Sequence, residues 1–267
     1  MGAAMRSGQV YLLHRVNPCV KLLAAVTVVV VLTFVFDPLT PAIVLLLTLL
    51  AGRFLGGLSF AAQLKPMLVF FIAGLAILVA NILFNKENAV SPAVVDLGFL
   101  RVTRAALWAA GSLWLRLLLF ALVSLVFVKT TSPQDFILSL VHQLKVNYRV
   151  AYGTMVGYRM LPLLVSDYHT IRAAQRVRGS SERSGLLHPW WWLRRFAIPL
   201  LAGAVRRASR VAVAMDARAF GAFPERTYRV RMRVDGKDLA FLAAVLVVLA
   251  VVVAGTWVAG VARFTVQ

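Results

Sequence analysis

The chain has 267 residues, of which 61% are hydrophobic and only 15% are charged. That balance excludes an ordinary soluble globular domain and indicates a membrane protein. The 29 Lys and Arg residues against 10 Asp and Glu residues give a formal charge of +19, which in a soluble chain would suggest a nucleic-acid partner. In a membrane protein the same excess is typical of cytoplasmic segments facing anionic lipid or an acidic protein, so we expect no nucleic-acid partner.

Long apolar runs predict five membrane-spanning helices, because crossing about 30 Å of hydrocarbon takes about 20 mostly apolar residues. The first two are expected over residues 20–36 and 38–56, and the helix-breaking sequence DPLTP at 37–41 separates their apolar runs. The next two are expected over 66–84 and 105–128, separated by a segment whose Pro, Asn and mixed charges are typical of a loop. The last, 239–261, contains no charge and lies within a final segment, 238–267, that also holds the C-terminal tail. Residues 1–128 therefore form the predicted membrane region.

The segment 129–237 carries most of the positive charge. It holds 19 of the 29 Lys and Arg residues but only six Asp and Glu residues. By the positive-inside rule this segment is expected on the cytoplasmic side. Five spans then place the N-terminus inside and the C-terminus outside, in the plasma membrane of a prokaryote.

Helix start and stop signals divide this basic segment into amphipathic helices. Ser132 is expected to cap a short helix that begins at Pro133. A second helix is expected over about 151–178, interrupted or kinked near Pro162 and ended by Gly179.

A third helix is expected to begin after HPWWWLRR, to break at Pro199 and to end near Gly221. Its apolar residues recur at helical spacing and predict a packed face. These residues are Leu201, Ala204, Ala208, Val211 and Met215.

An arginine between small or slim neighbours stands at the end of each of the two longer helices. The first triplet is Val177, Arg178 and Gly179, and the second is Ala217, Arg218 and Ala219. A cation at a helix C-terminus stabilises the macrodipole by about 0.3 to 1 kcal/mol, and that purely structural interpretation stays open for each triplet taken alone. The alternative is that each unshielded guanidinium forms a bidentate pair with a carboxylate on a partner protein.

Taken together the motifs resemble the transmembrane T component (EcfT-like) of energy-coupling factor transporters, the ATP-driven importers of vitamins and transition-metal ions. The resemblance covers nearly the whole chain, from LLHRVNPCVKLL through TTSPQDFILSL and YRMLPLLVSDYHTIRAAQRVRG to AMDARAFG. It implies that two coupling helices end in Ala-Arg-Gly-like tripeptides, whose arginines dock into two ABC-type ATPase subunits. Carried over by motif, the docking arginines are Arg178 and Arg218, with Val177 and Ala219 departing from the family's alanine and glycine.

The resemblance also implies a small membrane-embedded S component that binds the substrate. It further implies that this chain is a scaffold and that ATP binds only to the partner chains. Asp216 is a secondary candidate, because it could orient the helix end that carries Arg218. The fold expected is an all-α integral membrane protein of about five transmembrane helices, with cytoplasmic coupling helices between spans four and five.

Other residues carry weaker predictions. Arg116 is the one charge deep in a span and is expected to face protein or to snorkel, without an intramembrane carboxylate as partner. Asp167 could pair with Arg159 or Arg172 between coupling helices, and is expected to be an intrahelix brace rather than a site. The run Trp190–Trp192 with Arg194 and Arg195 is typical of an interfacial anchor. Small residues that would permit close helix approach are Gly74, Ala76, Ala80, Gly255 and Gly260.

Two other function classes compete with the scaffold. A self-contained membrane carrier would usually show broken midplane helices and intramembrane ionisable residues along a path. An enzyme would need convergent carboxylates, a nucleophile with its base, or metal ligands. The single cysteine and four scattered histidines predict no catalytic, cofactor or metal site, and no Walker A motif occurs.

Overall fold

The computed structural model describes residues 11–84, 93–96, 101–178, 193–223, 228 and 231–259. The chain divides into two compact units. The membrane unit comprises Met1–Ser139 and Met232–Gln267, and the helix-pair unit comprises Leu140–Arg231. The inserted unit is therefore somewhat shorter than the segment 129–237 set apart by its charge.

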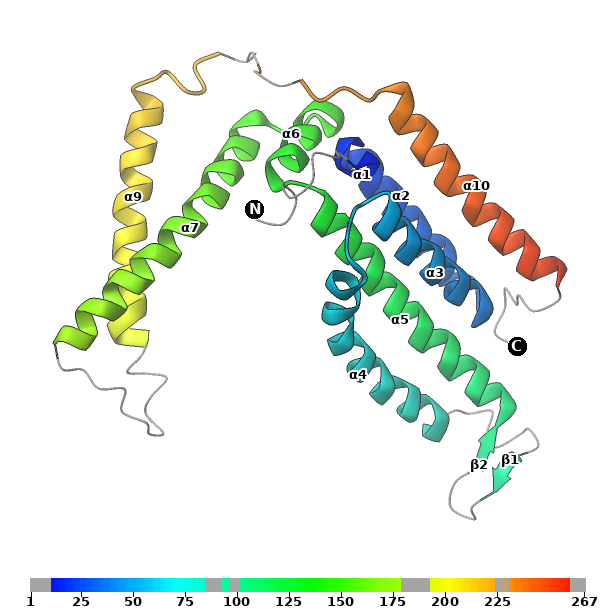
Figure 1. Ribbon diagram of the computed structural model, residues 1–267. Helices are drawn as coiled ribbons and strands as arrows, with labels where there is room; N and C mark the ends of the chain where they lie inside the picture. Colours follow the sequence, from blue (N-terminus) through cyan, green and yellow to red (C-terminus); the bar gives the residue numbers. More distant parts are fainter. Residues whose placement is uncertain are drawn as a thin grey trace. The chain divides into compact units, whose positions relative to one another are not determined.

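The membrane unit is helical at each of the five positions where apolar runs predicted a span. Helices α2, α3, α5 and α10 run side by side, and α4 packs on α5 (Figure 1). With 16 residues each, α2 and α3 are only about 24 Å long, whereas α4, α5 and α10 are long and apolar enough to cross a membrane. The bounds are α1 Leu12–Arg15, α2 Pro18–Thr33, α3 Leu39–Phe54, α4 Phe60–Phe84, α5 Arg104–Thr130 and α10 Gly236–Val258.

Helices α4 and α10 begin three or more residues before the predicted spans. Helix α4 starts at Phe60 rather than at residue 66, because the Ser59 hydroxyl accepts the Ala62 N–H at 3.2 Å and the helix continues through Pro66. Helix α10 starts at Gly236 rather than at 239, because a capping box of Asp235 and Asp238 satisfies its first N–H groups.

Composition predicted a loop between α4 and α5, but the structure places a short β-hairpin in this connection. Strands β1 (Ala93–Asp96) and β2 (Arg101–Thr103) pair antiparallel, with Asp96 opposite Arg101 and an irregularity between Ala93 and Val95. Their valines favour extended backbone. Thr103 ends β2 and caps α5 by accepting the Ala106 N–H at 3.3 Å. The all-α class is confirmed apart from this hairpin.

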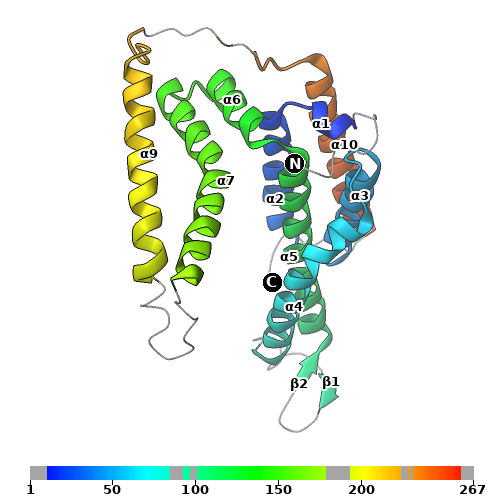
Figure 2. The same cartoon turned by 60° about the vertical axis from the view of Figure 1, so that its left-hand side comes forward.

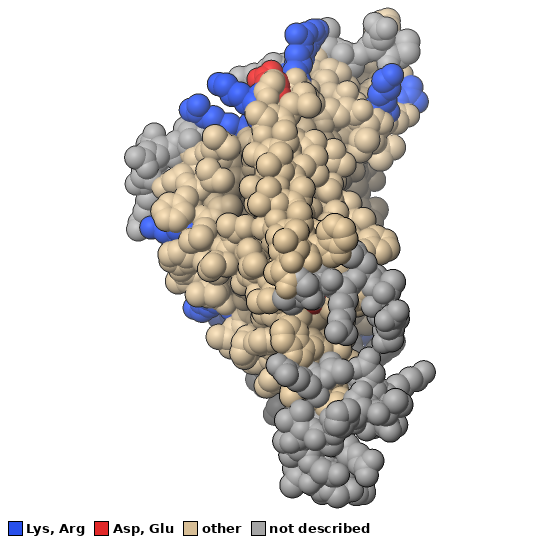
Figure 3. Space-filling model, turned by 90° about the vertical axis from the view of Figure 1, so that its right-hand side faces the viewer, with Lys and Arg blue, Asp and Glu red and all other residues tan. Residues whose placement is uncertain are grey.

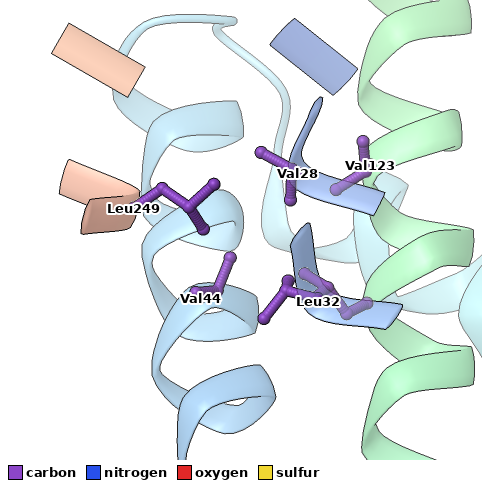
Figure 4. Close-up of a cluster of buried hydrophobic side chains, with 6 residues drawn as sticks. Val28, Leu32, Val44, Val123 and Leu249 are labelled. Atoms are coloured by element: carbon purple, nitrogen blue, oxygen red, sulfur yellow. The ribbon is translucent and has the colours of Figure 1, made fainter. Parts of the chain in front are cut away.

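The core of the membrane unit lies where α2, α3, α5 and α10 meet. Figure 4 shows Leu249 of α10 and Val44 of α3 directed toward Val28 and Leu32 of α2, with Val123 of α5 beside them. Next to this cluster lies an apolar cavity of about 360 Å³ between the same four helices. On the face that carries α10, charged side chains gather mainly at the end where α10 begins, and the centre of that face is mostly uncharged (Figure 3).

Close helix approach occurs at only one of the small residues that can be judged by packing. A Cβ on Gly74 of α4 would lie 2.6 Å from Trp114 Cδ1 of α5, so the expectation is confirmed there. At Gly255 a Cβ would meet nothing within 4 Å, and Ala76 and Ala80 are exposed, so no helix of the described chain packs on these residues and the expectation stays a prediction there. Gly260 lies outside the described residues.

The helix-pair unit is built from two long helices, α7 (Tyr148–Val177) and α9 (Ile198–Asp216), which lie side by side (Figure 2). Helix α6 (Pro133–Leu144) joins this unit to α5 and begins as predicted, with the Ser132 hydroxyl accepting the Asp135 N–H at 3.1 Å. Helix α7 continues through Pro162 without the predicted interruption, and the predicted kink there stays a prediction.

Helix α9 also differs from its prediction. A π-helical turn, η2 (Leu193–Ala197), precedes it, and Pro199 lies in its first turn, where the missing N–H costs nothing, so no break occurs. Its packed face is rotated relative to the predicted one. Leu201 and Ala208 are exposed, whereas Ala204, Val211 and Met215 are half-buried as expected.

Candidate functional site

The two arginines singled out by the sequence stand at opposite ends of one antiparallel helix pair. The start of α7 is bonded to the turn that follows α9, since Arg149 Nη2 donates to the Gly221 carbonyl at 2.7 Å. Arg178 caps the far end of α7, and Arg218 lies in the turn after α9. The 30 residues of α7 span about 45 Å. The pair therefore carries one exposed guanidinium near each end.

Arg178 is the C-cap of α7. Its backbone N–H donates to the Ala174 carbonyl, and its side chain is exposed. Val177 before it is 89% exposed. Gly179, the third residue of the triplet, lies outside the described residues.

Arg218 lies in a tight turn that ends α9. The N–H of Phe220 returns to the Met215 carbonyl at 3.0 Å, and Ala219 has a left-handed φ of +54°. That conformation favours glycine, so alanine here carries a small backbone strain. Ala217 and Arg218 are exposed, and so is Asp216, which forms no ion pair with Arg218 in the structure.

Asp167 braces the helix pair rather than its own helix. Its Oδ2 accepts from Arg207 Nη2 of α9 at 2.8 Å, with both side chains about one-quarter to one-third exposed. The predicted partners, Arg159 and Arg172, were therefore wrong, and so was the intrahelix brace, whereas a pair between the coupling helices is confirmed. The rotation of α9 that exposes Leu201 turns Arg207 toward α7.

A buried polar network, missed in the sequence, closes the end of the membrane unit where α10 begins. The Lys21 ammonium donates to the Leu13 carbonyl at 2.9 Å and to the Thr130 carbonyl at 3.0 Å. It also lies in the field of the Asp135 and Asp238 carboxylates. Lys21 therefore ties the N-terminal segment, the end of α5 and the starts of α6 and α10 to one another.

Asp238 and Ser139 extend this network. One Asp238 oxygen accepts the Asn17 N–H at 2.9 Å and the other accepts the Asp235 N–H at the same distance. Cys19 Sγ lies 3.3 Å from Ser139 Oγ of α6. The N-terminal segment LLHRVNPCVKLL therefore contacts two parts of the chain. One is the end of α5 and α6, which lead into the helix-pair unit, and the other is the start of α10, where the chain returns from it.

Arg116 faces protein, as expected, but a carboxylate lies nearby. Its guanidinium donates to the Val35 carbonyl and sits 5.2 Å from the centre of the Phe36 ring. The buried Asp37 adds a coulombic attraction from the turn DPLTP, outside the predicted spans, so the expectation of no intramembrane carboxylate partner is not contradicted. Arg116 therefore braces the opposite end of the membrane unit.

The described part of the chain holds no group of three or more His, Cys, Asp or Glu residues able to bind a metal. The Trp190–Trp192 run lies outside the described residues.

The geometry defines a helical membrane protein with an inserted helix pair whose two ends carry exposed arginines. The profile of the CbiQ family, described as "Cobalt transport protein", matches residues 9–229, and the chain belongs to that family. It is 32% identical to the energy-coupling factor transporter transmembrane protein EcfT of Limosilactobacillus fermentum, over 88% of this chain and 90% of the relative. It is 30% identical to EcfT of Brevibacillus brevis, over 92% and 93%. The resemblance to T components is confirmed.

A third relative differs in size. The chain is 25% identical to the "Putative ABC transporter ATP-binding protein BL0043" of Bifidobacterium longum over 91% of its own length, but only 32% of the relative. A region similar to this chain therefore occurs within a longer protein that is named for ATP binding.

Proposed function

We propose that this chain is the non-catalytic transmembrane subunit of an energy-coupling factor importer. It couples ATP hydrolysis by two partner ABC-type ATPases to uptake of a vitamin or a transition-metal ion through a separate S component. The observation that carries the proposal is the pair of exposed arginines at opposite ends of α7 and α9. Two contacts about 45 Å apart along α7 suit two ATPase subunits, one at each end.

The family membership and the relative named for ATP binding support ATPase partners for this chain. A planar guanidinium suits such contacts, since it forms two parallel hydrogen bonds with a carboxylate and resists rotation of the joint. When nucleotide closes the ATPase pair, the two contacts move relative to each other and drive the S component inward.

The proposed orientation places the helix-pair unit in the cytoplasm of a prokaryotic cell. The chain leaves the membrane unit at the end of α5 and returns at the start of α10, which the Lys21 network joins. Exposed basic side chains gather at these helix ends, in agreement with the positive-inside rule. They are Arg15, Arg53, Lys65, Lys129, Arg233 and Lys237.

Reconstitution separates the coupling subunit from a self-contained carrier. The purified chain alone in liposomes is expected to take up neither radiolabelled vitamins nor Co²⁺ and Ni²⁺. The complex purified with this chain from its native membranes is expected to take up one of these classes, with ATP and not without it. ATP-independent uptake by the chain alone would instead establish the carrier.

A further inference from the structure

The turn that presents Arg218 contains two left-handed residues, Ala219 at φ +54° and Gly221 at φ +89°. Its own backbone hydrogen bonds set its local conformation, for example from Phe220 N–H to the Met215 carbonyl at 3.0 Å and from Ala222 N–H to the Ala219 carbonyl at 3.1 Å. Where the turn lies relative to α7 depends in addition on the residues that pack against it, and the direction of the Arg218 side chain depends on the turn.

The first turn of α7 supplies two polar contacts to this turn from more than 70 residues away in the chain. Arg149 Nη2 donates to the Gly221 carbonyl at 2.7 Å, and Tyr148 Oη donates to the Phe223 carbonyl at 2.9 Å. A charged donor makes a stronger hydrogen bond to a carbonyl than a neutral one does. Both acceptors lie just beyond Arg218.

Aromatic packing adds a third contact on the same turn. The ring of Phe220 lies 4.9 Å from the ring of Tyr152 and 5.9 Å from the ring of Tyr148, measured between centroids. Arg149 is itself held in place, since its backbone N–H donates to the Asn147 cap at 3.0 Å and its Nε donates to Tyr148 Oη at 3.4 Å.

Glycine at 221 fits this arrangement for two reasons. Its φ of +89° is one that other residues rarely adopt, and a Cβ there would lie 3.2 Å from Arg149 Nε and 3.4 Å from its Cζ. A larger residue would strain the turn and crowd the guanidinium at the same time.

We propose that Tyr148, Arg149 and Tyr152 form a clamp that fixes the Ala217–Phe223 turn and so sets the direction in which Arg218 meets its ATPase. These are positioning residues, since they act through the turn and not on the ATPase. The role assigned to Arg218 rests on the proposed function, whereas the ordering of the turn does not.

The first test reads the turn directly. Cys19, the only cysteine, is replaced by alanine and a nitroxide label is attached to Ala222→Cys, an exposed position in the turn. In the full chain in detergent, Arg149→Ala combined with Tyr148→Phe is expected to shift the electron paramagnetic resonance spectrum toward the mobile component. Arg149→Lys, which keeps a donor, should restore part of the order. An unchanged spectrum in the double variant would overturn the clamp.

Controls separate the clamp from general damage to the helices. Arg159→Ala removes an exposed arginine from the same helix, and Gly203→Ala adds a Cβ that meets nothing within 4 Å. Both are expected to leave the label ordered, whereas Gly221→Ala should mobilise it. Equal mobility in all variants would mean that the turn is not held by these contacts.

The second test measures the affinity of each unlabelled variant for the ATPase subunits that copurify with the wild-type chain. The Arg149→Ala and Tyr148→Phe double variant is expected to bind about tenfold more weakly. If Arg218→Ala weakens binding and the double variant does not, the positioning role is wrong. If Arg218→Ala itself has no effect, the proposed docking role fails, and the label spectra alone then decide whether the clamp exists.

Discussion

Replacing Arg178 and Arg218 together with alanine is expected to abolish ATP-driven uptake and to release the ATPase subunits, while the helices stay folded. Both side chains are exposed and contact no other residue of the described chain through an ion pair, so their loss removes no intramolecular support. Truncating one partner of a desolvated ion pair at an interface costs about 2 to 5 kcal/mol, and the proposed docking gives the double variant two such pairs to lose. Copurification measures the loss of ATPase binding, and transport by reconstituted complexes measures the loss of uptake.

The matched control removes the same charge from the same two helices. Arg159 of α7 and Arg210 of α9 are exposed, and their double alanine variant is expected to copurify with the ATPases and to transport normally. The double variant Arg178→Lys and Arg218→Lys tests whether docking needs the bidentate geometry of the guanidinium, since lysine keeps the charge but not the bidentate fork. Normal transport by the Arg178→Ala and Arg218→Ala variant would show that the ATPases dock elsewhere.

Lys21→Met is expected to destabilise the membrane unit more than any other single lysine replacement. The variant leaves the buried carbonyls of Leu13 and Thr130 without a donor, at about 1 to 3 kcal/mol each, and leaves Asp135 and Asp238 without their cation. The midpoint of thermal unfolding in detergent should fall on the order of 10 °C.

Lys129→Met is the control for this change. Lys129 lies at the same end of the membrane unit and is exposed, so its loss should leave the midpoint nearly unchanged. A Lys21→Met midpoint as high as that of Lys129→Met would mean that the network contributes little. Because the network joins the entry and exit of the helix-pair unit, we also expect Lys21→Met to reduce uptake at temperatures where it stays folded.

The helices could be predicted because a membrane-spanning run is recognised by length and apolarity alone. Their starts could not, since Ser59 and Asp235 cap α4 and α10 from polar positions outside the apolar run. The β1–β2 hairpin was missed because its strands are only four and three residues long, too short for a periodic pattern.

The candidate site could also be predicted only in part. Arg178 and Arg218 were found from local motifs and from the resemblance, and the structure adds that they lie at opposite ends of one helix pair. The Lys21 network could not be predicted, because Asn17 and Asp238 are 221 residues apart and meet only in the fold. Asp167 was assigned Arg159 or Arg172 as its partner, whereas it pairs with Arg207 of α9, because the sequence does not determine how one helix is rotated against the next.

Photo-crosslinking in native membranes tests the docking claim most directly. A photoreactive amino acid at Val177 or Ala217, both exposed beside an intact arginine, is compared with one at Leu201, which is 62% exposed in the first turn of α9. Crosslinks from Val177 and Ala217 to ATPase subunits, and none to them from Leu201, are the predicted result. Crosslinks to the ATPases from Leu201 alone would contradict it.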